Sequence, residues 1–209
     1  MARSCGCSRN CLLLASRSFY ETFSGYLSQA RRSIWIWSPW TSKRVRQLLP
    51  VLAEAGGRGV RATLFVRDPG DQLQGRSDYQ GYLADLRAVL STVVEINVMH
   101  QKIVIIDEKT VLLGSLNSLS QSWTREVMLV MNGAHFARKL LEHEHAADIA
   151  VPPRCGACRG TMIDLRRRRA GDWYWRCYNP SCPCRSTGNR RAWTRPVTGR
   201  RGYPQSGTS

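Results

Sequence analysis

The stretch HQKIVIIDEKTVLLGSLN, residues 100–117, is the most informative part of this chain, and its spacing is H-x-K-x4-D-x6-G-S-x-N. The apolar, largely β-branched residues within 101–106 predict a buried strand, and residues 111–116 predict a second strand after a short turn. Side chains alternate between the two faces of a strand, so His100 and Lys102 share one face. On the second strand, Ser115 and Asn117 share a face in the same way.

These two strands are expected to bring together an imidazole, an ammonium, a hydroxyl and a carboxamide. That set suits a phosphoryl group, because it offers one nucleophile and several donors for anionic oxygens. The string resembles the signature of the phospholipase D superfamily, whose members include lipases, nucleases and DNA-repair phosphodiesterases.

The resemblance implies a role for each signature residue. His100 is expected to be the nucleophile that forms a covalent phosphohistidine, or the acid that protonates the leaving group. Lys102 and Asn117 are expected to bind phosphate oxygens, Asp107 to support the site, and Ser115 to be its small polar partner. Glu126 stands where the family often carries a glutamate, which implies that it orients His100. A surface charge at a strand edge is the alternative for Glu126.

The residues around the motif predict a sequence of helix, strand, helix and strand, which is typical of an α/β fold. We expect a mixed β-sheet sandwiched by helices over residues 18–150. This region is similar to the phospholipase-D-like domain found at the C-terminus of some helicase-type ATPases. No P-loop motif occurs in the chain, so the motor is absent and a helicase-type ATPase is a candidate partner.

The composition of the chain points to a polyanionic partner. Its 209 residues carry a formal net charge of +16, which favours nucleic acid over an anionic membrane. No apolar run approaches the length of about 20 residues needed to span a bilayer. The short apolar run at residues 11–15 is also too short for a signal peptide, so we expect a cytoplasmic protein. Residues 1–17, with Cys5, Cys7 and Cys11, predict an unstructured N-terminus, and the role of these cysteines stays open.

Residues 151–186 follow a Val-Pro-Pro linker and predict a small zinc ribbon. Cys155 and Cys158 form one pair, and Cys177 and Cys182 form the second pair eighteen residues later. Two thiolate pairs at this separation are typical of a structural four-cysteine zinc site, and metal would supply the stability that so small a core lacks. Cys184 could replace Cys182, and disulfides are the alternative. The ribbon resembles the four-cysteine zinc fingers of bacterial type I topoisomerases, which bind single-stranded DNA.

Arginine and aromatic residues in the ribbon favour nucleic-acid binding. Residues 151–209 hold thirteen arginines against two aspartates, a net charge of +11. Arginines can pair with phosphates while aromatic rings stack on unpaired bases. The candidate residues are Arg166, Arg167, Arg168, Arg169, Trp173 and Trp175. The alternative is that the tryptophans pack the ribbon core. Residues 187–209 predict a basic, disordered tail.

The leading interpretation is a metal-independent nuclease acting on DNA, with zinc in a structural role only. Because the chain contains one H-x-K string, two copies should pair about a two-fold axis as a homodimer to supply two histidines. A DNA-binding protein without catalysis is the second interpretation, and a phospholipase is the third. The choice between DNA and RNA, the strand preference and the pathway stay open.

Overall fold

The computed structural model describes residues 3–4, 11–67, 78–97, 99–120, 125–167, 173–177, 179–183 and 194–197. Its strands form one mixed sheet in the order β1-β2-β8-β7-β6-β3-β4-β5-β9-β10-β11. The strands are β1 (Arg3–Ser4), β2 (Cys11–Ala15), β3 (Ser33–Trp37), β4 (Arg61–Arg67), β5 (Thr92–Ile96), β6 (Ile103–Ile106), β7 (Thr110–Gly114), β8 (Val127–Asn132), β9 (Asp164–Arg167), β10 (Trp173–Arg176) and β11 (Thr194–Pro196). The helices are α1 (Ser16–Ser28), α2 (Arg44–Gly57), α3 (Asp78–Val89), α4 (Ala134–His143) and α5 (Ala146–Ile149).

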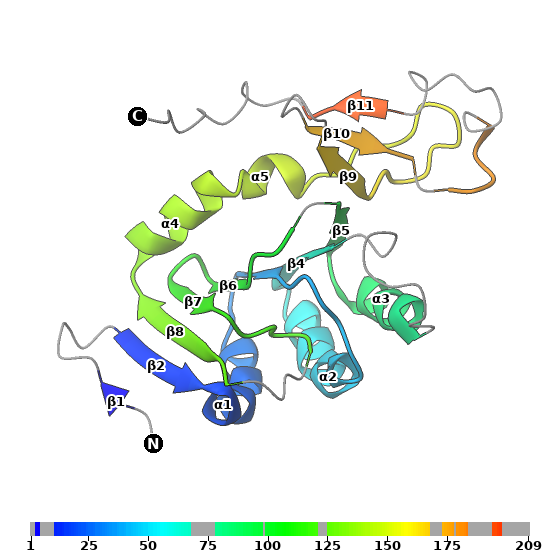
Figure 1. The fold of residues 1–209 in the computed structure, drawn as a ribbon. Coiled ribbons are helices and arrows are strands. Elements are labelled where there is room, and N and C mark those ends of the chain that lie inside the picture. Colours follow the sequence, from blue (N-terminus) through cyan, green and yellow to red (C-terminus); the bar gives the residue numbers. More distant parts are fainter. Residues whose placement is uncertain are drawn as a thin grey trace.

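The centre of the sheet is a parallel unit in which β3, β4 and β5 are joined by α2 and α3. Five consecutive residues of β4 are buried, as expected for a strand covered on both faces. Helices α1, α2 and α3 cover one face, and α4 and α5 cover the other (Figure 1). The predicted α/β fold, a mixed sheet between helices, is therefore confirmed.

Two hydrophobic cores lie on the two faces of this sheet. The first core lies under α1, α2 and α3 and includes Phe23, Leu64 and Val104. The second core lies under α4 and α5 and includes Trp37 and Phe65. The rings of these last two residues stack with their centroids 4.6 Å apart. The second core extends beyond α5 into the C-terminal region.

Strand β2 corrects the expectation that residues 1–17 are unstructured. Residues 11–15 pair antiparallel with β8 from Cys11↔Met131 to Ala15↔Val127, and α1 already begins at Ser16. The pattern of residues 11–15 alone did not indicate a strand. The ladder that stabilises β2 is formed with a segment more than a hundred residues away in the chain. Cys5 and Cys7 lie outside the described residues.

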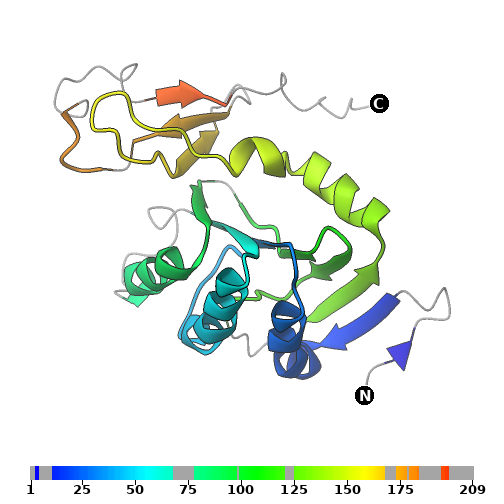
Figure 2. The same cartoon turned by 180° about the vertical axis from the view of Figure 1, so that it is seen from behind.

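The C-terminal region is continuous with the main sheet. Strand β9 runs parallel to β5, with Glu95↔Asp164 and Ile96↔Leu165 as partners, and β10 and β11 follow antiparallel. These strands lie next to α5 and β5 in both views (Figures 1 and 2). The linker at residue 151 therefore does not separate two independent cores. Residues 194–196 form β11, so the expectation of a fully disordered tail is wrong there; most of the tail lies outside the described residues.

Candidate active site and metal centre

Apart from Asp107, the signature residues lie where β3, β4 and β5 end and β6 begins, which we call the site edge. Ile103 at the start of β6 pairs with Trp37 at the end of β3, and the N–H of Gly114 donates to the carbonyl of Lys102 at 3.3 Å. In open α/β sheets, this carboxyl edge of the parallel strands is where ligands bind. Strand β6 begins at Ile103 rather than residue 101, so His100 and Lys102 lie in the connection just before it.

His100 and Lys102 nevertheless meet, as predicted from their spacing. The Lys102 Nζ lies 3.2 Å from His100 Nδ1 and donates to the His100 carbonyl oxygen at 3.1 Å. The His100 side chain is exposed. The Lys102 ammonium lowers the pKa of His100 most strongly, and partial burial and the charge of Arg67 lower it further. His100 is therefore neutral at neutral pH and has a lone pair available for attack on phosphorus.

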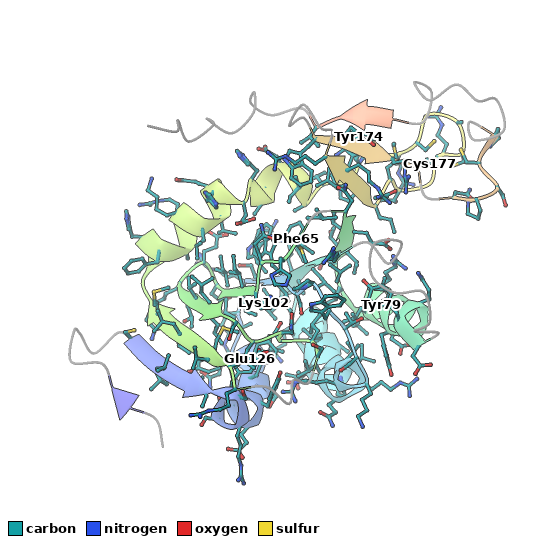
Figure 3. The ribbon with its side chains drawn as sticks, viewed as in Figure 1. Phe65, Tyr79, Lys102, Glu126, Tyr174 and Cys177 are labelled. Carbon is teal, nitrogen blue, oxygen red and sulfur yellow. The ribbon has the colours of Figure 1, made fainter. Side chains whose placement is uncertain are left out.

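Glu126 acts on Lys102. Burial lowers the pKa of Lys102, and the charge of Glu126 opposes that shift (Figure 3). The backbone N–H of Glu126 donates to Ser16 Oγ at 3.3 Å, which ties the start of β8 to the start of α1. The carboxylate thus helps to keep Lys102 charged in a partly buried position. Its implied role in orienting His100 stays a prediction.

Ser115 and Asn117 follow β7 rather than lying within it, because β7 ends at Gly114. Ser115 Oγ accepts the N–H of Val127 at 3.2 Å and so joins the ends of β7 and β8. A side chain at Gly114 would lie 2.2 Å from the Val127 carbonyl, which explains the glycine. The side-chain oxygen of Asn117 is buried without a hydrogen-bond partner among the described residues. This oxygen is an acceptor, so an anionic phosphate oxygen would bind the amide NH₂ group of the same side chain instead.

Asp107 lies at the opposite end of β6 from Lys102. Its carboxylate accepts the N–H groups of Arg31, Arg32 and Ser33 at 2.7–3.1 Å. Burial would raise the pKa of Asp107, but these backbone donors and the Arg32 charge outweigh it and hold the pKa low. Asp107 therefore anchors the start of β3 to the turn between β6 and β7, and its expected support of the site stays a prediction.

A positively charged residue near His100 was missed in the sequence. Arg67 ends β4 and lowers the pKa of His100 through its charge. Its guanidinium carbon lies 5.7 Å from the centre of the Trp40 ring. No motif in the sequence singles out Arg67; its position at the carboxyl end of a parallel strand was the available signal.

Tyr20 of α1 holds the loop after β7. The hydroxyl of Tyr20 donates to the carbonyl of Ser120 at 2.7 Å and lies 3.3 Å from that of Asn117. The guanidinium of Arg44 stacks over the Tyr20 ring at 4.1 Å. These contacts position the Asn117 loop from the side of the first core.

The four predicted cysteines converge in the ribbon, which we define as residues 151–183 (Figure 3 labels Cys177). Their sulfur atoms all lie within 4.8 Å of one another, and the pairs Cys155–Cys182 and Cys158–Cys177 are 3.7 Å apart. A tetrahedral zinc with Zn–S bonds of about 2.3 Å requires sulfurs about 3.8 Å apart. These residues could therefore hold a structural metal ion. Cys184 lies outside the described residues.

The turn at the first pair favours thiolate ligands. The N–H of Cys155 donates to the carbonyl of Gly160 at 2.8 Å, and the N–H of Arg159 donates back to Cys155 at 3.0 Å. The backbone N–H groups of Cys158 and Ala157 outweigh burial and lower the pKa of Cys155 to about 6. A thiolate at neutral pH is the form that binds metal.

The residues predicted to contact nucleic acid differ from one another in their burial and contacts. Trp175 is 2% exposed and packs in the second core, so the prediction that it stacks on bases is wrong. Arg166 pairs with the buried Asp164 at 2.8 Å. Arg167 is exposed, and its guanidinium lies 5.8 Å from the centre of the half-buried Trp173 ring. Arg168 and Arg169 lie outside the described residues.

The chain was compared with known proteins. Residues 24–145 match the model of the family described as cardiolipin synthase, PLD-like domain. NucT from Helicobacter pylori is 20% identical with a TM-score of 0.53, over 65% of this chain and 93% of NucT. Nuc from Salmonella typhimurium, a phospholipase D family member, is 21% identical with a TM-score of 0.51, over 65% of this chain and 91% of Nuc. These likenesses show a shared fold. No curated protein matches the chain in sequence, and none of its described helices is long and apolar enough to cross a membrane.

Proposed function

This chain belongs to the PLD-like domain family, and on that premise we propose that it is a phosphodiesterase that cleaves nucleic acid through His100. The observation that carries the proposal is the contact between Lys102 Nζ and His100 Nδ1 at 3.2 Å, in which the ammonium lowers the pKa of His100 and so favours its neutral form. A lone pair next to a fixed cation is what attack on a phosphodiester requires.

The reaction proceeds in two balanced steps. An imidazole nitrogen of His100 attacks phosphorus, the P–N bond forms, and the P–O bond to the leaving group breaks. The His100 of a second copy is protonated when the phosphodiester anion is bound, because that negative charge raises its pKa above its value in the empty site, and it gives this proton to the departing oxygen. Water then attacks phosphorus, loses a proton to that second histidine, and breaks the P–N bond to release a phosphate monoester. Lys102 and Asn117 hold the anionic oxygens, and Arg67 adds a further positive charge.

The charge of the chain selects nucleic acid as the substrate class. The net charge is +16, and Arg154, Arg159 and Arg167 are exposed on the ribbon. These arginines replace Arg166 and Trp175 as the ribbon's candidate contacts, because those two side chains are engaged within the protein. Arginine contacts to phosphates give binding that depends on salt but little on base sequence.

Zinc fits the four sulfur atoms of the ribbon, and its function there is to stabilise the fold. The phosphoryl-transfer steps use the side chains of the site edge. We therefore expect cleavage by metal-loaded protein without any added divalent ion, and no increase when Mg²⁺ is supplied.

The test is cleavage of a labelled single-stranded DNA oligonucleotide by metal-loaded protein in buffer freed of divalent ions. His100→Ala should abolish cleavage and leave oligonucleotide binding unchanged. His135→Ala is the matched control, because His135 is an exposed imidazole on α4. Acid-labile, alkali-stable label on the protein would report the phosphohistidine. Binding without any cleavage by the wild type would overturn the proposal in favour of a DNA-binding protein.

The proposed pairing of two copies has its own test. Mixing wild-type protein with His100→Ala protein under conditions of subunit exchange should lower activity more than in proportion to dilution, because each mixed dimer lacks one histidine. A wild-type protein that is active as a strict monomer by size-exclusion mass measurement would contradict the two-histidine mechanism.

A further inference from the structure

The segment that carries His100 is attached to the ribbon. After β5 the chain runs from Asn97 to Lys102 before β6 begins. The N–H of Asn97 donates to the carbonyl of Leu165 at 3.3 Å. The side-chain oxygen of Asn97 accepts the N–H of Arg167 at 2.9 Å. Both contacts come from β9, three residues before the candidate nucleophile.

The residue next to His100 is also fixed by the ribbon side of the molecule. Met99 is 4% exposed and belongs to the second core, together with Leu165, Trp175 and Cys177. The ligand cysteines Cys155 and Cys182 belong to the same core. His100 therefore directly follows a residue of the hydrophobic core that also contains the candidate metal-binding thiols.

Buried charges line the junction between β5 and β9. Glu95 and Asp164 are paired across the two strands and are 0% and 1% exposed. Glu95 pairs with Arg87 of α3, and Asp164 accepts from Arg166 and Arg176. Arg166 and Arg176 lie on β9 and β10, so the Asp164 ion pairs hold the ribbon strands together, whereas the attachment to β5 comes from backbone hydrogen bonds such as that from the Glu95 N–H to the carbonyl of Ile163 at 2.9 Å.

Strands β9 and β10 of the ribbon are four residues long each, and the four cysteines lie in the segments outside these strands, so a bound metal would hold those segments in place. We infer that the metal-loaded ribbon is a positioning element for His100, with Asn97 as the residue that transmits its position. This inference rests on the proposed function. Removal of the metal from the ribbon should therefore lower the rate of cleavage, even though the chemical steps themselves use no metal.

Three variants test the role of Asn97. Asn97→Leu removes the acceptor at similar size and should lower kcat about tenfold, because small displacements of a reacting group are costly, while KM for the oligonucleotide stays within about twofold. Asn97→Asp keeps the acceptor and should restore kcat. Asn132→Leu is the control, since the Asn132 side-chain oxygen also accepts one hydrogen bond, from Thr110 at 2.8 Å, at the other end of the sheet. Equal kcat in Asn97→Leu and wild type would overturn the inference.

Metal removal gives a readout that is independent of activity. The full chain is titrated with a chelator while hydrogen exchange is followed for the backbone amides of residues 95–103 and of α1 and α2. We expect exchange at 95–103 to rise in step with metal loss, while the two helices stay protected. Unchanged protection at 95–103 in metal-free protein would contradict the inference. If wild-type protein cleaves no oligonucleotide, the proposed function fails, and the exchange experiment still decides the coupling.

Discussion

The two faces of the sheet differ in the elements that cover them. The first core is covered by α1, α2 and α3, and each of these helices adjoins a strand of the sheet along the chain. The second core is covered partly by α4 and α5 and partly by the ribbon, and it includes Cys155, Cys177 and Cys182. We therefore expect the first face to be stable from the chain alone and the second face to gain stability from a metal held by these cysteines. The candidate nucleophile lies on a segment attached to the second face.

The largest expected effect compares one aromatic residue from each core. Phe23 is 0% exposed in the first core and Trp175 is 2% exposed in the second. Replacing either by Ala in metal-loaded protein should lower the free energy of unfolding by about 3–5 kcal/mol, measured by urea denaturation. In metal-free protein, Phe23→Ala should cost the same, whereas Trp175→Ala should cost little, because its core has already opened. If Trp175→Ala lowers the free energy of unfolding by the same amount after metal removal, the second core does not depend on the metal and the comparison fails.

An intermediate effect concerns the site edge, where chemistry can change while both cores stay intact. Lys102→Met removes a phosphate-binding charge and should lower kcat/KM about a hundredfold. It also removes the main cause of the lowered pKa of His100, so that pKa rises. Since attack needs the neutral imidazole, the acid limb of the kcat/KM profile should move to higher pH.

The control for Lys102 is Lys139→Met on the exposed face of α4, which should change neither the rate nor the profile. The free energy of unfolding of both variants should stay within about 0.5 kcal/mol of wild type. An acid limb that moves to lower pH in Lys102→Met would contradict the electrostatic role of Lys102.

The smallest effect separates two aspartates by the sign of their pH dependence. Backbone donors hold the pKa of Asp107 low, so its ionised form adds stability above the unfolded-state value near 3.9 and this is lost as pH falls through the folded pKa. Burial raises the pKa of Asp164 more than Arg176 and Arg166 lower it. Its contribution to stability therefore falls as pH rises above the unfolded-state value.

These opposite dependences of stability on pH can be measured from the free energy of unfolding between pH 3 and pH 6. Asp107→Asn should remove a rise of stability with pH worth about 1 kcal/mol after solvent screening, and carboxyl shifts in an NMR titration should place Asp164 above Asp107. If the pKa of Asp164 lies below that of Asp107, the Asp164 carboxylate at the ribbon junction is more exposed to water than the structure indicates.

Several features could be predicted from local patterns. The spacing of His100 and Lys102 predicted their contact, and the two cysteine pairs predicted the convergence of four sulfurs. Local patterns could not reveal β2, which is stabilised by pairing with β8, or the burial of Trp175, which depends on the second core. Both depend on partners distant in the chain.

The sequence by itself determined which chemical groups the protein brings to a phosphodiester and to a metal ion, because short spacings on neighbouring segments bring those side chains together. Only the tertiary structure decided that the ribbon belongs to the same sheet and second core as the segment carrying His100. The physical reason is that pairing between β5 and β9 is a long-range contact. Its partners, Glu95 and Asp164, are indistinguishable in the sequence from ordinary surface carboxylates.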